Sequence, residues 1–308
     1  MEMMVFALLL FFIVSIITGM AIYHILQKKA LELKIDSLEK IEPKEEIEKI
    51  RGERMNVEIL NRDNITLEVD RAYGVSHRGN RTHNEDYILI KKIKDAYLLA
   101  VADGIGGHSA GEVASKMAVD TLEEFMREKY REDLSIEEIT ELLKEAYKLA
   151  DGKIKENAVG EREGMGTTLT TALIKGDKCI IINCGDSRGY LIRDGDIIHR
   201  TKDHSFVQAL IDSGQITEEK AMEHPMKNII TSALGLEELK IDTYLWDLRE
   251  GDTLLLSSDG LHDYVKKEEI LKVVSSYRDP REIVKRLLDI ALEKTEDNVS
   301  IVVYRKIS

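Results

Sequence analysis

Short apolar runs bounded by Gly, Asp or Asn recur along the chain after residue 67. Runs of about four to eight residues with such boundaries predict β-strands. Two-residue turns, Gly176-Asp177 and Asp194-Gly195, separate neighbouring runs and predict hairpins, so largely antiparallel sheets are expected. The predicted strands cover 87–90, 97–102, 168–174, 179–183, 190–193, 197–200, 253–257 and 299–304.

Three longer stretches show helical periodicity together with signals that start a helix. Ser109 and Ser135 each precede a glutamate by three positions, which is the spacing of a capping box, and Asp279-Pro280 combines an N-cap with a proline in the first turn. The predicted helices cover 109–130, 135–157 and 279–294. Hairpins together with long helices predict an α+β domain, with helices packed on sheets, over residues 67–308.

The N-terminal segment has a different pattern. Residues 3–26 carry no formal charge and have about the length that a helix needs to cross a bilayer, so they predict a transmembrane anchor. A cleaved signal peptide is the alternative, but the only early charge is Glu2 and the segment continues past its small residues. Lys28 and Lys29 follow the span and nothing basic precedes it, which predicts a single-pass cell-membrane protein with a cytoplasmic domain. Residues 27–66 form a charged juxtamembrane linker, either a helical stalk or coiled coil, or a solvated spacer.

Composition narrows the class of partner. The chain has 57 acidic and 44 basic residues, and its net charge of −13 argues against nucleic acid. Its two cysteines, Cys179 and Cys184, lie in one predicted strand and point to opposite faces, which excludes a disulfide between them and indicates a reducing compartment. Neither begins a Cys-x5-Arg phosphate loop, so a cysteine nucleophile is not expected.

Acidic residues are placed at the ends of several predicted strands. The strand 97–102 leads into Asp103, and the strand 253–257 leads through one serine into Asp259. Acids at 85–86 and 296–297 precede two further strands. Any single Asp-Gly is most simply a turn, as Asp194-Gly195 is. If the strand ends converge, however, these carboxylates need a counter-ion, and all-oxygen ligation favours Mg²⁺ or Mn²⁺ over zinc.

The segments that carry these acids resemble the metal-dependent Ser/Thr protein phosphatases of the 2C class, in particular their bacterial members. The resemblance covers about residues 72–304. The motifs occur in the family's order, at Gly79–Asp86, Val101–His108, Gly166–Thr168, Asn183–Arg188, Ser258–Asp263 and Asp297–Ser300. It implies a sandwich of two antiparallel β-sheets flanked by helices, in α-β-β-α layers.

The resemblance also implies two Mn²⁺ or Mg²⁺ ions and a set of residues that hold them. Asp103 resembles the carboxylate that bridges both metals, and Gly104 the residue whose backbone carbonyl contacts one of them. Asp259 and Asp297 match the remaining carboxylates of the first metal site.

Further residues match the second metal site, a third site and the substrate contact. Glu85 resembles a ligand of the second metal, and Asp86 is expected to orient metal-bound water. Asp186 and Asp263 match positions that form a weaker third site in some members. Arg81 matches the arginine that binds the substrate phosphate, and a guanidinium fork suits phosphate oxygens.

Residues 203–225 resemble the mobile flap of bacterial members, and a surface-packed segment is the alternative interpretation. Three positions depart from the family. Ile105 stands where animal members have a histidine proposed as general acid, and His108 is interpreted as structural. The interval from Gly79 to Arg81 matches the animal spacing, and Ser232 stands where an arginine is common.

The resemblance therefore implies hydrolysis of phosphoserine and phosphothreonine on proteins by a metal-activated water, with Arg81 and Asp103 as the catalytic residues. Phosphorylated proteins are the expected substrates, and a cognate Ser/Thr kinase is a family-level expectation. The alternative is a catalytically inactive pseudo-phosphatase that serves as a membrane-tethered scaffold. The complete set of acids favours an active enzyme, because pseudo-phosphatases of this family lack metal ligands.

Overall fold

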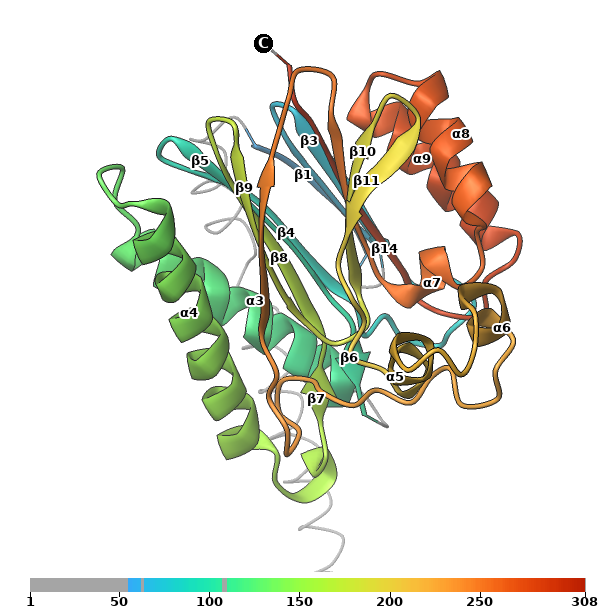
Figure 1. The fold of residues 1–308 in the computed structure, drawn as a ribbon. Helices are drawn as coiled ribbons and strands as arrows, with labels where there is room; N and C mark the ends of the chain where they lie inside the picture. The colour runs from blue at the N-terminus through green and yellow to red at the C-terminus, as the bar shows by residue number, and fades with distance from the viewer. Residues whose placement is uncertain (1–54, 62–63, 107–109, 308) are drawn as a thin grey trace, which may run out of the picture. The chain divides into compact units, whose positions relative to one another are not determined.

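The computed structural model describes residues 55–61, 64–106 and 110–307 (Figure 1). All of them belong to one compact unit, Arg54–Ser308. The predicted anchor at 3–26 and most of the predicted linker at 27–66 lie outside the described residues, as do His108 and Ser109. No helix within the described ranges is long and apolar enough to cross a bilayer.

In the described part of the chain the main strands form two antiparallel sheets. The seven-stranded sheet has the order β1 (Met55–Asn61), β2 (Asn64–Val69), β3 (Ala72–His77), β14 (Val299–Arg305), β13 (Thr253–Ser257), β10 (Arg188–Arg193) and β11 (Asp196–Arg200). The five-stranded sheet has the order β12 (Asp242–Asp247), β9 (Lys178–Cys184), β8 (Leu169–Lys175), β5 (Ala96–Ala102) and β4 (Tyr87–Ile93). A short pair, β6 (Gly104–Ile105) with β7 (Gly166–Thr167), extends from β5 towards the site.

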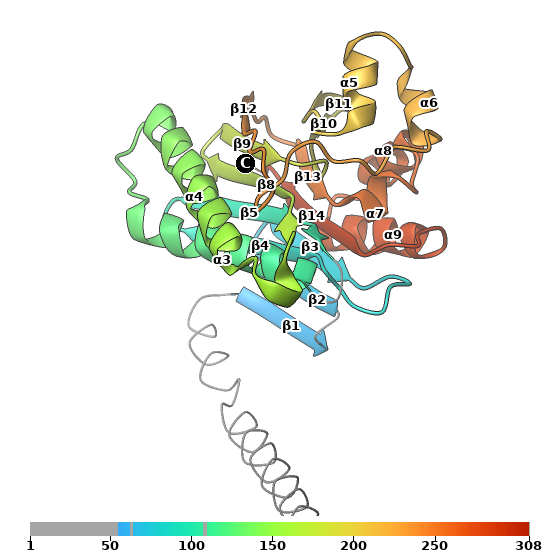
Figure 2. The same ribbon diagram turned by 90° about the horizontal axis from the view of Figure 1, so that it is seen from below.

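Helices cover the outer face of each sheet (Figures 1 and 2). Helices α3 (Ala110–Lys129) and α4 (Ile136–Asn157) pack on the five-stranded sheet, and α8 (Lys267–Ser276) and α9 (Pro280–Leu292) pack on the seven-stranded sheet. This is the predicted α-β-β-α arrangement, and the α+β fold class is confirmed. β1 and the first residues of β2 lie ahead of residue 67, where the predicted compact domain begins.

Strand β5 shows how the sequence produces these layers. Its apolar run is buried on both faces, because side chains alternate along a strand. Leu98 and Ala100 contact the helical layer of α3 and α4, whereas Leu99 and Val101 join the core between the two sheets. A strand packed between two apolar layers therefore has a continuous run of apolar residues, not an alternating pattern.

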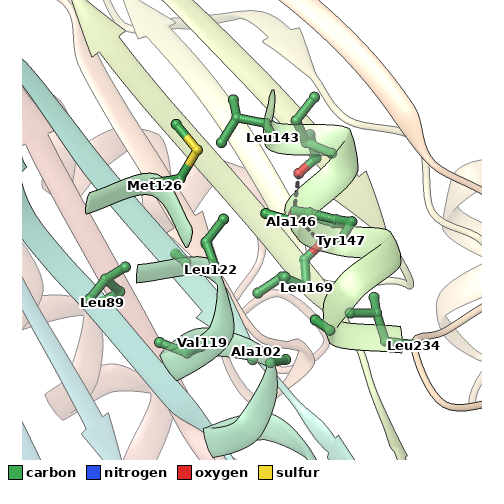
Figure 3. Packing of buried hydrophobic residues seen from close by; sticks show 14 of the residues in the cluster. Leu89, Ala102, Val119, Leu122, Met126, Leu143, Ala146, Tyr147, Leu169 and Leu234 are labelled. Carbon is green, nitrogen blue, oxygen red and sulfur yellow. Dashed lines mark hydrogen bonds between the residues drawn. The ribbon is translucent and has the colours of Figure 1, made fainter. Parts of the chain in front are cut away.

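The helical layer is fixed by one buried tyrosine as well as by apolar packing (Figure 3). Leu122 and Met126 of α3 pack with Leu143 and Tyr147 of α4 in one fully buried cluster. The Tyr147 hydroxyl lies within hydrogen-bond distance of the carbonyls of Leu169 and Ile182, at 3.0 and 2.9 Å. A buried hydroxyl with partners on two adjacent strands aligns α4 on the sheet.

The predicted helix starts agree with the structure where it describes them. Ser135 and Glu138 form the capping box of α4, and Asp279 caps α9 ahead of Pro280. Between β11 and β12 the chain leaves the sandwich as two short helices, α5 (Phe206–Asp212) and α6 (Glu218–Met222), which lie in the predicted flap. Two short helical turns, η1 (Gly160–Arg162) and α7 (Asp259–His262), complete the described elements.

Candidate active site

The four acidic segments singled out in the sequence meet at one end of the sandwich, near β6 and α7 (Figure 1). The Gly104 N–H donates to the Glu85 carbonyl at 3.1 Å, and the Glu85 N–H donates to the Asn298 side chain at 2.8 Å. The Ser258 hydroxyl donates to Asp86 at 2.7 Å. These contacts join all four segments. The strand ends that carry the acids therefore converge, as a shared metal site would require.

Crowding of carboxylates dominates the electrostatics. Burial and the nearby charges of Asp86 and Asp259 raise the pKa of Asp103 well above its usual range. Burial, followed by the charges of Asp186 and Asp297, has the same effect on the pKa of Asp259. Both shifts show that the site disfavours its own negative charge and would be stabilised by bound cations.

Two carboxylate oxygens in this cluster have no hydrogen-bond partner. Within the described residues, Asp86 Oδ1 and Asp259 Oδ1 are buried and unpaired. Burial raises the pKa of Asp86 from 3.8 to about 7. A buried unpaired oxygen costs free energy unless a donor or an ion satisfies it. Oxygen donors of this kind fit hard divalent cations such as Mg²⁺ and Mn²⁺.

The acidic side chains lie close together, but they are not arranged as a preformed metal site. In the described ranges no group of three or more His, Cys, Asp and Glu side chains is arranged to hold an ion. Asp297 instead forms an ion pair with Arg81, whose guanidinium lies 2.8 Å from its carboxylate. Asp86 accepts the Ser258 hydroxyl.

Arg81 lies at the exposed mouth of the cluster, with 56% of its side chain accessible. Its Nε donates to the Glu296 carbonyl at 3.1 Å, beside the ion pair with Asp297. The nearby carboxylates of Asp297, Asp259 and Glu85 favour its charged form, and the Arg81 pKa is raised although burial opposes this. A charged, exposed guanidinium at this position is suited to receive an anionic group from solvent.

Asn298 holds the loop that carries Arg81 and Glu85. Besides accepting the Glu85 N–H, its amide donates to the carbonyls of Arg78 and His83 at 2.7 and 2.8 Å. Gly79 in the same loop packs against the Asp297 carbonyl, and a Cβ at this position would collide with that oxygen. Gly79 also has a φ of +61°, which favours glycine. Asn298 lies in a family motif, but its own role could not be predicted, because its partners lie more than 200 residues away in the sequence.

Buried hydroxyls hold Asp86 and Asp103 in place. Ser258 also accepts the Ser300 N–H at 2.9 Å, and so links the turn before Asp259 to β14. Thr168 Oγ1 accepts the Asp103 N–H at 2.9 Å. The motif that contains Thr168 therefore fixes the backbone at Asp103.

Asp186 and Asp263 lie beside Asp259, as the proposed third site requires. Burial and the charges of Asp203 and Asp263 raise the pKa of Asp186 to about 7. Lys227, just beyond the predicted flap, lies 2.8 Å from Asp263 and forms an ion pair with it. That contact was not anticipated from the sequence.

Ile105 and Ser232, which depart from the family pattern, are both placed by the structure. Ile105 lies in β6 next to Gly104 and has no titratable group. The Ser232 hydroxyl donates to the Glu238 carbonyl at 3.0 Å and accepts the Lys240 N–H at 2.7 Å, so it closes its own loop.

Comparison with known proteins identifies the family. The family model "Protein phosphatase 2C" matches residues 73–291. The Ser/Thr protein phosphatase PstP of Mycobacterium tuberculosis is 40% identical over 226 residues, which are 72% of this chain and 42% of that protein. The chain therefore spans less than half the length of that relative.

Two further relatives match almost along their whole length. The Ser/Thr phosphatase stp of Listeria monocytogenes is 38% identical over 235 residues, 73% of this chain and 91% of that protein. A crystal structure of the catalytic domain of a Ser/Thr protein phosphatase PstP, in complex with two manganese ions, superposes with a TM-score of 0.65 at 35% identity, covering 77% of this chain and 98% of that one. Fold, order of motifs and converging carboxylates agree with these matches, and the chain belongs to the protein phosphatase 2C family, close to its bacterial PstP and Stp members.

Proposed function

We propose that this protein hydrolyses phosphoserine and phosphothreonine esters in proteins at the cytoplasmic face of the cell membrane. The observation that supports the chemistry is the cluster of carboxylates, with unpaired buried oxygens on Asp86 and Asp259, beneath an exposed Arg81. When bound, a pair of Mn²⁺ or Mg²⁺ ions supplies Lewis acidity to activate a water and positive charge to offset the phosphate.

Each acid has a proposed place in holding these ions. Asp103 would bridge them, and the Gly104 carbonyl, Asp259 and Asp297 would complete one site. Glu85 would complete the other. The Ser258 hydroxyl and burial hold Asp86 in one orientation, which suits a carboxylate that directs a water by hydrogen bonding. Asp186 and Asp263, with Asp259, would form a weaker third site.

Arg81 is the proposed phosphate ligand. Its pairing with Asp297 keeps the guanidinium next to the acids while more than half of the side chain stays accessible. An arriving phosphate dianion offers two oxygens to the guanidinium fork, a better match than one carboxylate oxygen. Ile105 has no proton to give, so the leaving alkoxide would take its proton from water.

The membrane location and the kinase partner also remain proposals. They are supported by the uncharged segment 3–26 and by Lys28 and Lys29, which place the following domain on the cytoplasmic side under the positive-inside rule. A cytoplasmic Ser/Thr kinase would produce the phosphoproteins that this site consumes.

The decisive experiment compares Asp103→Asn with wild type on a phosphothreonine peptide and on p-nitrophenyl phosphate, with Mn²⁺ or with a chelator. Asparagine keeps the shape but removes the bridging charge, so turnover should fall by at least about 100-fold. Asp194→Asn is the matched control, because Asp194 occupies an Asp-Gly turn at a φ of 52°, which asparagine tolerates. Wild-type turnover in Asp103→Asn, or full activity in chelator, would contradict the proposed site.

A further inference from the structure

A cavity of about 350 Å³ lies between the flap helices and the seven-stranded sheet. Its walls come from β11, from α5 and α6, and from the chain around α7 and the start of α8. We refer to it as the flap cavity. Its volume falls within the range of roughly 300–1,000 Å³ that is common for ligand sites.

Two chemically different parts line the flap cavity. Asp186, Asp259 and Asp263 form one part, and these are acids of the site described above. The other part is apolar and includes Ile197, Ile198, Val207, Ile211, Met222 and Ile270. The cavity therefore adjoins the carboxylate cluster at Asp259.

Most of the positive charge on the walls is already paired. Arg188 and Asp203 form an ion pair at 2.6 Å, and Lys227 pairs with Asp263 at 2.8 Å. Arg200 of β11 pairs with Glu218 of α6 at 3.1 Å, which also joins the flap to the sheet. Because these cations have partners, an acidic group on a ligand gains little from them. Ligand binding would therefore be stabilised mainly by apolar contacts with the uncharged wall.

The apolar wall is partly open to solvent. Ile198 of β11 is 41% exposed and Met222 of α6 is 45% exposed, and both line the cavity. Exposed large apolar side chains that line a cavity beside a catalytic site are typical of a surface that a ligand covers.

We propose that the flap cavity is a substrate subsite that takes an uncharged aliphatic side chain lying close in sequence to the phosphorylated residue. This inference rests on the proposed function. A polypeptide that presents its phosphate to Arg81 and the acids has neighbouring side chains within reach of a cavity lined by the same acids. An aliphatic side chain buried there gains from the apolar wall, whereas an acidic one meets the carboxylates of Asp186 and Asp259.

The test uses the full chain with Mn²⁺ and a set of phosphothreonine peptides. In an otherwise alanine and lysine background, one leucine is placed at each flanking position in turn, and a second set carries glutamate instead. At one position leucine should raise kcat/KM by about tenfold over alanine, as expected for apolar groups in a specificity pocket. Glutamate at that position should lower it.

Two methionines four positions apart offer a matched pair of variants. Met222→Asp introduces a charge into the flap cavity, whereas Met226→Asp introduces the same charge at a methionine of similar exposure, 40%, that does not line it. The leucine preference should fall towards onefold in Met222→Asp and persist in Met226→Asp. Hydrolysis of p-nitrophenyl phosphate, which has no flanking residues, corrects both variants for the fraction of active enzyme.

The outcomes separate this inference from the proposed function. If neither p-nitrophenyl phosphate nor any peptide is hydrolysed with Mn²⁺, the proposed function fails. If all peptides are hydrolysed alike, if glutamate is preferred, or if the leucine preference survives in Met222→Asp, the phosphatase proposal stands and the subsite is refuted.

Discussion

At the scale of single residues, the site keeps several carboxylates in a state that is unfavourable without cations. Asp103 and Asp259 lie among other acids, and burial together with repulsion raises the pKa of each. Arg81 forms an ion pair with Asp297 and not with these two acids. Such an arrangement costs stability in the folded protein, and it is maintained where function requires a strong attraction for cations.

The first prediction follows from these shifts and concerns the protein in the presence of a chelator. The pKa of Asp186 is about 7 in the folded state against 3.8 for an ordinary aspartate. The folded state then holds its proton more tightly than the unfolded state, so the free energy of unfolding falls as the pH rises from about 4 to about 7. One such proton contributes up to about 1.4 kcal/mol per pH unit.

Urea unfolding at several pH values in chelator measures this dependence. Asp186→Asn removes one of the titrating groups, so its free energy of unfolding should depend less steeply on pH over that window. Asp194→Asn, in an exposed turn, should follow wild type. A wild-type stability that rises with pH across the window would show that the carboxylates are not crowded as described.

The second prediction concerns Arg81. Arg81→Lys keeps the charge but loses the planar fork, so one of two hydrogen bonds to the phosphate should be lost. Hydrogen bonds to charged groups contribute about 1.5–3 kcal/mol, which corresponds to a roughly 10- to 100-fold fall in kcat/KM for a phosphothreonine peptide. Arg131→Lys, at an exposed arginine after α3, is the control. An unchanged kcat/KM in Arg81→Lys would remove the guanidinium from phosphate binding.

At the scale of elements, the site depends on loops that are anchored to strands from other parts of the chain. The loop between β3 and β4 carries Arg81 and Glu85, and Asn298 at the start of β14 binds it through three hydrogen bonds. Because β3 and β14 are neighbours in the sheet, the register of that pair sets the position of the loop. The sheet therefore determines the geometry of the site as well as the stability of the fold.

The third prediction tests this anchoring. Asn298→Ala removes three hydrogen bonds and should destabilise the protein by about 3 kcal/mol, at about 1 kcal/mol for each bond. The Mn²⁺ concentration needed for half-maximal turnover should also rise, because Glu85 is no longer held. Thermal unfolding and a Mn²⁺ titration of p-nitrophenyl phosphate hydrolysis measure the two effects.

Asn157→Ala is the control for this change. Asn157 is exposed at the end of α4, and its amide donates within the helix, to the Lys153 carbonyl. Asn157→Ala should change the free energy of unfolding by no more than a few tenths of a kcal/mol. It should leave the Mn²⁺ requirement unchanged. Loss of stability in Asn298→Ala with an unchanged Mn²⁺ requirement would reduce Asn298 to a purely structural role.

The elements that the sequence predicts best are those buried on both faces or joined by tight turns. The run 97–102 becomes β5, and the run 190–200 with its Asp194-Gly195 turn becomes the β10–β11 hairpin. The strand Asp242–Asp247 was missed, because it is an edge strand with largely exposed residues and shows no continuous apolar run. In the other sheet the edge strand β1 was missed as well, and so were its neighbour β2 and the buried strand β3.

The same reasoning explains which parts of the site were predictable. Asp103 and Asp259 were found because strand ends, turn residues and acids are local features of the sequence. The contacts of Asn298 and the pairing of Lys227 with Asp263 were not, because they join segments that only the folded sheets and flap bring together. Local pattern identifies the acids, and tertiary structure identifies what holds them.

At the scale of the whole molecule, the two sheets are best understood as a frame that presents loops from both layers at one end. β5 and β4 belong to one sheet, whereas β13 and β14 belong to the other, yet the acids that follow or precede them are electrostatic neighbours. The core between the sheets, built from residues such as Leu99, Leu256 and Val302, fixes the distance between those loops. A site assembled from both sheets is therefore expected to be lost when the sandwich unfolds, and not before.

The last prediction concerns the N-terminal segment. Residues 54–308 contain both sheets, their helical layers and every proposed site residue, so a chain that lacks residues 1–53 should fold alone. It should hydrolyse p-nitrophenyl phosphate with Mn²⁺ within about twofold of the full chain, because no predicted site residue is removed. In cells it should move from the membrane fraction to the supernatant, because the uncharged span 3–26 that predicts the anchor is gone. Fractionation of both chains, with turnover measured in each fraction, provides the test. A full chain found in the supernatant would refute the anchor and leave the catalytic proposal intact, whereas an inactive but folded 54–308 chain would show that the N-terminal residues contribute to catalysis.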